Sequence, residues 1–452
     1  MKRTFKTADY DATLDVTIRL GDCLPPDHLA RFVVDTIAHL DLSAIYARYG
    51  TRGGQPYAPD ILLALLFYGY ATGIFSTRKL ERATYETVPF RFLAGNLHPD
   101  HDTLATFRKT FLPELKDLFA QVLLLAHTAG VLKLGNISLD GTKIHADASK
   151  SKAVSYKHLL ALQAHLRAEV EQLFALSEAA SHDDLPDALV LSHEIAIRQA
   201  RLARLAEAKA VLEVRAKERS ALEQAEYQTK MQERAEKERQ SGRTPRGRPP
   251  KPPTPGPRDK DQYNFTDPES RIMKHSSSEG FEQDYNAQIA VDQDSLLIVG
   301  ESLSNHPTDQ HQVEPTLDSI PPDLGSPEAA ALDAGYFSEA NIAVFEGRAI
   351  EPYIATGRDG HHPSWQERFA QLPEPPAEDA SPKLKMAYKL KSAIGKAIYG
   401  LRKCTVEPVI GIIKEVLGFR QFSLRGEQAV AGEWCLVCLA FNLKRLHSLL
   451  QG

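Results

Sequence analysis

The residues from Ser151 to Arg239 form a long stretch that lacks glycine and is dominated by Ala, Leu, Glu, Lys and Arg. This composition predicts helix, and Pro186 is expected in a turn between two helices. Apolar residues recur in the second half of the stretch at a spacing of three and four, at Leu202, Leu205, Ala208 and Val211 or Leu212. That spacing is typical of an antiparallel helical pair or a coiled coil. Because strand-like segments lie on both sides, the chain must interrupt a sheet with a long helical insertion.

The strand-like segments alternate with helical ones in a regular order. Helices are expected from Asp309 to Ile320 and from Ser338 to Phe345, and again from about Lys383 onwards. Strands are expected at Asn136–His145, Tyr285–Asp292, Leu296–Leu303, Ala329–Asp333 and Ile350–Thr356. A hairpin followed by strand–helix–strand units predicts an α/β fold, with a mixed sheet flanked by helices.

The N-terminal part, residues 1–130, reads as a series of short helices. Leu29, Phe32, Val33, Ile37 and Leu40 follow a helical period. Short helices with surface Arg and Lys are compatible with a helix-turn-helix DNA reader and equally with a small structural bundle.

Positive charge is concentrated in two places, although the net charge is −5. The residues from Arg239 to Lys260 hold seven Lys or Arg against one acid, and those from Ser381 to Arg425 hold ten against two. Local basic surface attracts phosphate whatever the total charge. Each cluster can also be an ordinary solvated face.

The first basic cluster includes a segment rich in Pro, Gly and Arg, from Ser241 to Pro257, which is expected to be an extended or disordered linker. Within it, Arg246-Gly247-Arg248-Pro249 resembles the core of an AT-hook, which lays two arginines along a narrow minor groove. The alternative is a plain basic linker.

The expected cellular compartment is inferred from the few cysteines and from the absence of signal-peptide and membrane-spanning patterns. There are four cysteines, and Cys435 and Cys438 lie within an apolar run, so we expect them to be buried core residues and not metal ligands. No apolar segment follows the N-terminal charges, and no run of about 18 apolar residues occurs. We therefore expect no signal peptide, no membrane partner and a cytoplasmic protein.

Three acidic residues occupy positions that suggest chemistry. Asp140 lies within the first strand, Asp333 ends a later strand, and Glu407 lies in Thr405-Val406-Glu407-Pro408. A carboxylate at the end of an apolar strand is costly to bury unless it is paired, and Mg²⁺ is one such partner. Taken singly, the two aspartates can be turn residues, and Glu407 can be an acid at a helix N-terminus. Pro408 favours a helix that starts near Thr405, with Glu407 at its positive end.

Taken together, these segments resemble the DDE transposases of bacterial insertion sequences, which have an RNase-H-like core. The chain is most similar to the subgroup with a Tyr-Arg-Glu-Lys signature, matched by Tyr399, Arg402, Glu407 and Lys414. Four residues separate Arg402 from Glu407 where three are usual, and Lys403 occupies the expected place. Further likeness comes from Asp102-Thr103-Leu104, Asp267-Pro268-Glu269, Tyr285-Asn286-Ala287-Gln288 and the tail from Phe422 to Arg445.

The resemblance implies a domain plan. Residues 1–130 would be an N-terminal helical, DNA-binding domain. Residues 131–150 and 262–452 would form the RNase-H-like catalytic domain, and residues 151–261 a helical insertion with a basic linker.

It also implies a mechanism. Asp140, Asp333 and Glu407 would hold two Mg²⁺ ions, for which Mn²⁺ can substitute. One ion would activate water to cut the element end, and the other would stabilise the leaving 3′ oxygen. The freed 3′-OH would then attack target DNA without a covalent enzyme intermediate. Tyr399, Arg402 or Lys403, and Lys414 would contact DNA phosphates, together with Arg246 and Arg248 in the linker. The partners would be the terminal inverted repeats, target DNA and other copies of the chain on paired ends.

Other interpretations remain open. The chain can be a transposase-derived repressor without activity, or a stand-alone RNase-H-like nuclease. Asp147, Asp292 and Glu415 are rival acids. Asp147 lies seven residues after Asp140, so strand alternation is expected to place it on the other face of the sheet. Asp292 and Glu415 lack a matching motif. His145 and His275 are expected to be ordinary surface histidines, because magnesium prefers oxygen ligands.

Overall fold

The structure is a computed structural model, which describes residues 19–50, 55–179, 188–244, 247–276, 280–357 and 374–451. The chain divides into two compact units. Unit 1 comprises Met1–Ile144 and Asn286–Gly452, and unit 2 comprises His145–Tyr285. The strand β5 (Gly280–Asp292) runs through the second boundary, so its two halves are described with different units.

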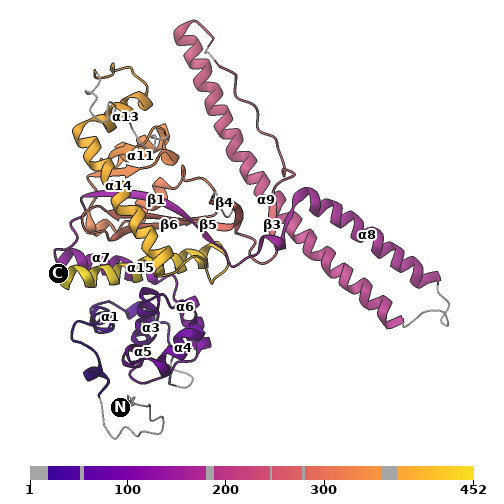
Figure 1. The fold of residues 1–452 in the computed structure, drawn as a ribbon. Helices are drawn as coiled ribbons and strands as arrows, with labels where there is room; N and C mark the ends of the chain where they lie inside the picture. Colours follow the sequence, from indigo (N-terminus) through magenta and orange to yellow (C-terminus); the bar gives the residue numbers. More distant parts are fainter. Residues whose placement is uncertain are drawn as a thin grey trace, which may run out of the picture. The chain divides into compact units, whose positions relative to one another are not determined.

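The N-terminal part of unit 1 is helical (Figure 1). Its most apolar helix begins with Pro59 at the first position, where a missing backbone N–H costs nothing, and nearly all of its residues are buried. The helices of this part are η1 (Leu20–Cys23), α1 (Leu29–Ala38), α2 (Ser43–Tyr46), α3 (Pro59–Ala71), α4 (Thr77–Glu86), α5 (Val88–Leu93), α6 (His101–Thr110) and α7 (Leu115–Thr128).

The sheet of unit 1 is mixed. Its strands follow the order β6-β5-β1-β7-β8, in which β5–β6 is antiparallel and β1–β7 and β7–β8 are parallel. Parallel neighbours need crossover connections, and helices supply them. The bounds of the strands are β1 (Asn136–His145), β6 (Ile298–Ser304), β7 (Ala329–Leu332) and β8 (Glu351–Ile354).

Helices cover this sheet, and α15 is one of the most deeply buried of them. From Val430 to Leu443 most of its residues are buried, and it packs on β6, α7 and α3. Asn442 fixes the position of α15, since its side-chain amide bonds both the N–H and the carbonyl of Ile298. The helices after β6 are α10 (Val313–Asp318), η3 (Pro322–Leu324), η4 (Ala334–Tyr336), α11 (Glu339–Gly347), α13 (Pro382–Lys391), α14 (Ala393–Gly411), a π-helical turn (Ile412–Val416) and α15 (Glu427–Gln451).

Unit 2 is built on two antiparallel helices. Helix α8 (Tyr156–Ala179) packs along the first half of α9 (Ala188–Ser241) through buried Leu159, Leu166, Leu205 and Leu212, as the apolar spacing predicted. The turn expected at Pro186 lies outside the described residues. At the base of the pair are η2 (Lys150–Lys152), β2 (Ala153–Ser155), β3 (Gln262–Asn264), β4 (Arg271–Ser276) and the beginning of β5.

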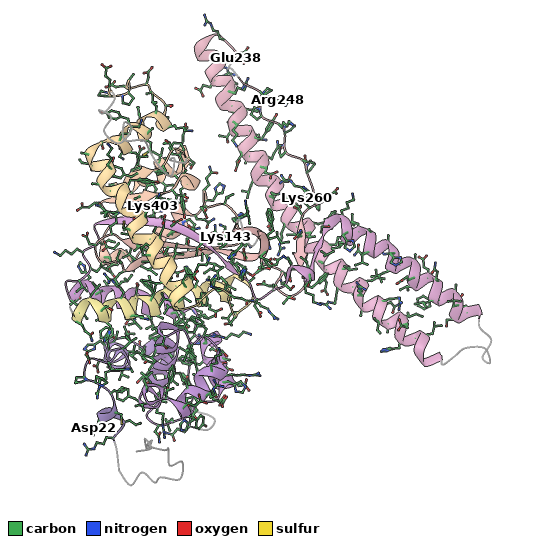
Figure 2. All side chains as sticks on the ribbon, in the orientation of Figure 1. Asp22, Lys143, Glu238, Arg248, Lys260 and Lys403 are labelled. Carbon is green, nitrogen blue, oxygen red and sulfur yellow. The ribbon has the colours of Figure 1, made fainter. Side chains whose placement is uncertain are left out.

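The linker after α9 is extended in its described residues and runs back along that helix (Figure 1). Arg234 donates to the carbonyl of Gly247, and Arg258 makes an ion pair with Glu223. Figure 2 labels Glu238 near the end of α9, and Arg248 and Lys260 along this return path.

The predicted fold class is confirmed: a mixed sheet is flanked by helices, with an N-terminal helical part and a long helical insertion. Cys435 and Cys438 are buried in α15, as expected, and burial raises the pKa of both thiols. Within the described residues, no helix is both long enough and apolar enough to cross a bilayer.

Candidate active site

Two of the three predicted acids lie on neighbouring parallel strands at the same height. The register of β1 and β7 pairs Asn136 with Ala329 and Ser138 with Ala331, an offset of 193 residues. The same offset takes Asp140 to Asp333, one residue beyond the end of β7. Adjacent strands are about 4.8 Å apart, so the two carboxylates lie side by side at the edge of the apolar core.

The local sequence explains why these two acids lie at the edge of the buried core. Ile137, Ser138 and Leu139 are buried, whereas the four residues from Asp140 to Lys143 are partly exposed. Asp333 accepts a hydrogen bond from the Gly335 N–H at 2.8 Å and caps the short helix η4. The turn role considered for Asp333 is therefore real, and it orients the carboxylate beside Asp140.

The third acid, Glu407, lies on α14 close to the same point. Arg402, one turn earlier on α14, donates from Nη1 to Asp140 Oδ2 at 2.8 Å, and its Nη2 lies 3.5 Å from Glu407 Oε1. Arg402 is almost fully buried, whereas the Glu407 side chain is 52% exposed. One guanidinium thus contacts two of the acids and also interacts electrostatically with Asp333.

The predicted start of this helix was wrong. Helix α14 begins at Ala393, so Tyr399, Arg402 and Glu407 share one helix, and Pro408 lies in its interior. Proline there leaves the carbonyl of Cys404 without its helical partner. Both Cys404 and Pro408 are exposed, so water can satisfy that carbonyl. Glu407 consequently lies far from the positive end of the helix, and the dipole does not stabilise its charge.

The charge balance of the site favours an additional cation. Burial is the main cause that raises the pKa of Asp140 to about 6, and the Asp333 carboxylate adds to it, against the lowering effect of Arg402. The Nε of Arg402 is buried and has no hydrogen-bond partner among the described residues. Arg402 alone therefore leaves the acids incompletely neutralised. Carboxylate oxygens are the ligands that Mg²⁺ prefers, so Asp140, Asp333 and Glu407 form a suitable donor set.

A fourth acid, Asp309, lies beside the three and was missed in the sequence. Its Oδ1 accepts hydrogen bonds from Asn286 at 2.7 Å and Gln288 at 2.9 Å, and lies 3.3 Å from the Lys143 ammonium. Asp309 also interacts electrostatically, as do Asp140 and Asp333, with the buried Tyr336. In the sequence Asp309 has the features of a helix start and nothing more. Its place in a polar loop between β6 and α10 is the one feature that could have indicated a site residue.

Space in the site is limited on the side of Asp309. A Cβ added to Gly141 would collide with the Gln288 amide and come within 2.9 Å of Asp309 Oδ1. Glycine after Asp140 therefore permits the close approach of β1 to these side chains.

The predicted DNA-contacting residues fall into different environments. The ring of Tyr399 lies 5.9 Å from the Arg402 guanidinium, and Lys403 is exposed on α14 (Figure 2). Lys414 donates to Thr142 Oγ1 at 3.1 Å and to the Lys143 carbonyl at 2.9 Å, so it ties the end of α14 to β1.

The remaining two predicted DNA contacts belong to the linker. Arg248 is exposed in unit 2, and Arg246 lies outside the described residues.

Two of the rival acids, Asp292 and Glu415, lie in unit 1 and make ordinary structural contacts there. Asp292 accepts hydrogen bonds from the N–H and hydroxyl of Ser295 in the turn between β5 and β6. Glu415 pairs with Arg420 on the surface.

Comparison with known protein families gives two matches. Residues 18–110 match the family described as Transposase domain (DUF772), and residues 376–447 match the family described as Transposase DDE domain. The first match covers the helices up to α6, and the second covers α13, α14 and most of α15, including Arg402 and Glu407. No curated protein and no solved structure matched the chain.

Proposed function

Because the chain is a DDE-type transposase of the insertion-sequence class by these two domains, we propose that it cuts the ends of its element and joins them to target DNA by metal-dependent phosphoryl transfer. Transposases of this type bind and cleave DNA.

The observation that carries the proposal is the convergence of three acids on one guanidinium. Asp140 and Glu407 lie 262 and 5 residues from Arg402 in sequence and both contact it. Asp333 follows the end of β7, at the height of Asp140 when the register of β1 and β7 is extended by two residues. The pKa of the partly buried Asp140 carboxyl is raised by burial and by Asp333, and a perturbed acid of this kind supports a site that is completed by a bound cation.

Asp140, Asp333 and Glu407 would hold the two magnesium ions. Bound there, the ions would activate water or the DNA 3′-OH as the nucleophile and would neutralise charge on the leaving oxygen. Asp140 must be ionised for this role, and Arg402 must release it. The released guanidinium can then form bidentate hydrogen bonds with a DNA phosphate. Asp309, held by Asn286 and Gln288, would fix the position of β5 beside the site.

The other DNA contacts are proposed from charge and exposure. Lys403 presents an ammonium on the exposed face of α14, next to Tyr399. Lys414 ties the π-helical turn after α14 to β1 through its hydrogen bonds. It would support DNA binding by holding these two elements together. Arg246 and Arg248 would bind the minor groove from the linker, and the N-terminal helices would recognise the terminal repeats. Action on two paired ends by a multimer is part of the same proposal.

The test is cleavage of a labelled duplex that carries the element's own terminal repeat, with full-length protein and Mg²⁺. The wild type is expected to nick at the 3′ end and to give strand-transfer products. Asp140→Asn, Asp333→Asn and Glu407→Gln should each lower the rate by about a thousandfold or more, because a metal ligand is lost.

Glu415→Gln is the matched control, since Glu415 is an exposed acid eight residues after Glu407 and should be dispensable. A gel shift without Mg²⁺ checks that each variant still binds the duplex. Cleavage by Asp140→Asn at the wild-type rate would remove this residue from the site and contradict the proposal. Nicking without strand-transfer products would favour the stand-alone nuclease.

A further inference from the structure

A second cluster of side chains that could hold a metal ion lies within unit 2. His145 Nδ1 is 2.8 Å from Asp284 Oδ1, and His275 Nδ1 is 3.0 Å from Asp284 Oδ2. The two imidazole rings stack with their centroids 4.1 Å apart. One ligand atom from each of the three side chains lies within 4.8 Å of the other two.

Burial separates these residues from ordinary surface histidines, and the expectation for them was wrong. Asp284 is completely buried, and the side chains of His275 and His145 are 7% and 30% exposed. The histidines are the hydrogen-bond partners of the Asp284 carboxylate in the described structure. A buried carboxylate is costly unless a cation or good hydrogen bonds stabilise it, and a bound metal ion would supply such a cation.

The three residues also come from distant parts of the sequence. His145 is the last residue of β1, and 130 residues separate it from His275 on β4, which precedes Asp284 on β5 by 9. The Ala146 N–H donates to the Gln283 carbonyl at 2.9 Å, so the backbones beside His145 and Asp284 are already joined. A single ligand bound by all three side chains would link β1, β4 and β5 at the base of the helical insertion.

We propose that His145, His275 and Asp284 form a binding site for a transition-metal ion, with Zn²⁺ as the ion that the donor set suits best. Two imidazole nitrogens and one carboxylate oxygen are typical zinc ligands, whereas Mg²⁺ favours oxygen alone. Ligand atoms around tetrahedral zinc are roughly 3.3 Å apart, so the observed 2.8 and 3.0 Å need to open by a few tenths of an ångström. The exposed edge of His145 leaves a position for water.

The experiment measures Zn²⁺ binding to untagged, chelator-stripped full-length protein by calorimetry and metal analysis. Millimolar Mg²⁺ is present throughout to occupy the carboxylate site of unit 1. The wild type is expected to bind about one equivalent of Zn²⁺. His145→Gln and His275→Gln should each weaken binding by roughly a hundredfold, the effect of one lost ligand.

The matched control is His165→Gln, because His165 lies in the same unit and its side chain is 68% exposed. It should bind Zn²⁺ like the wild type. Since Asp284→Asn alters a buried residue and can unfold the protein, the partly exposed His145 is the decisive position, with circular dichroism to verify folding. The proposal is overturned if the wild type binds no Zn²⁺, if both histidine variants bind it equally well, or if Asp140→Asn abolishes the binding. None of these results depends on DNA cleavage, so this site and the proposed function can fail separately.

Discussion

Arg402 on α14 donates a hydrogen bond to Asp140 on β1 at 2.8 Å, and this contact places a cation of the protein between the acids. A metal ion that binds Asp140 must displace that contact. The guanidinium is therefore both a stabiliser of the metal-free site and a competitor for it.

We predict that Arg402→Gln tightens the binding of Mg²⁺ to the DNA-free protein by about tenfold, because a charge-assisted hydrogen bond of roughly 1.5–3 kcal/mol no longer opposes it. The same variant should cleave more slowly, since a phosphate contact is lost. Calorimetry and the cleavage assay measure the two effects. Lys403→Gln, the exposed neighbour, should leave Mg²⁺ affinity unchanged. Weaker Mg²⁺ binding by Arg402→Gln would show that Arg402 supports the metal site instead of competing with it.

The pKa of Asp140 predicts how metal binding depends on pH. Burial and Asp333 raise this pKa from 3.8 to about 6, so the carboxyl is protonated below pH 6 and cannot bind a cation. Mg²⁺ affinity should be constant above pH 7 and fall by about tenfold per pH unit below 6. Without metal, the raised value means that this group lowers the free energy of unfolding as pH rises from about 4 to 6. Titrations at pH 5 to 8 check both trends, and equal Mg²⁺ affinity at pH 5 and 8 would be inconsistent with the assignment.

The three acids could be identified in the sequence, but the contacts that bring them together could not be predicted from it. Both strands were expected from the sequence: β1 from its strand-like residues and β7 from a continuous apolar run, all four residues of which are buried. The start of α14 was misplaced because proline is unfavourable in a helix interior. Only the structure shows that Cys404 and Pro408 are both exposed, so that water can reach the freed carbonyl.

Other residues gave no local signal. Asp309 acquires its place through side chains of β5, and His275 through contacts with residues on two other strands. Strand β2 has three residues and pairs with β3 more than a hundred residues later, so its short sequence could not predict it.

Gly141 is predicted to be intolerant of a side chain. Gly141→Ala would push a methyl group into Gln288 and Asp309, which moves β1 and Asp140 with it. Cleavage should fall by at least about tenfold, since displacement of a metal ligand by even 1 Å is costly. Gly347→Ala serves as control, because a Cβ there meets nothing within 4 Å. Unchanged cleavage by Gly141→Ala would mean that the packing between β1 and β5 does not constrain the site.

Glu301 on β6 provides a test of the core. Burial raises its pKa from 4.5 to about 7, against the lowering effects of Lys116 and Cys435. Because the folded value lies above the unfolded one, ionisation of Glu301 destabilises the protein as pH rises from about 4.5 to 7. Glu301→Gln should therefore raise the free energy of unfolding by about 1–3 kcal/mol at pH 8 and change it little at pH 5. Urea unfolding measures this, with the exposed Glu346→Gln as control, and an equal effect at both pH values would rule out the titration.

The most direct measurement of the shared metal site replaces Mg²⁺ with Fe²⁺ and generates hydroxyl radicals that cut the backbone beside the bound ion. The account predicts cuts near Asp140, Asp333 and Glu407 together, suppressed by excess Mg²⁺ and lost in Asp140→Asn. Cuts near His145 and His275 should persist in Mg²⁺, because that site prefers nitrogen ligands. If Mg²⁺-sensitive cuts appear at only one of the three acids, or at none, these carboxylates do not share a metal ion.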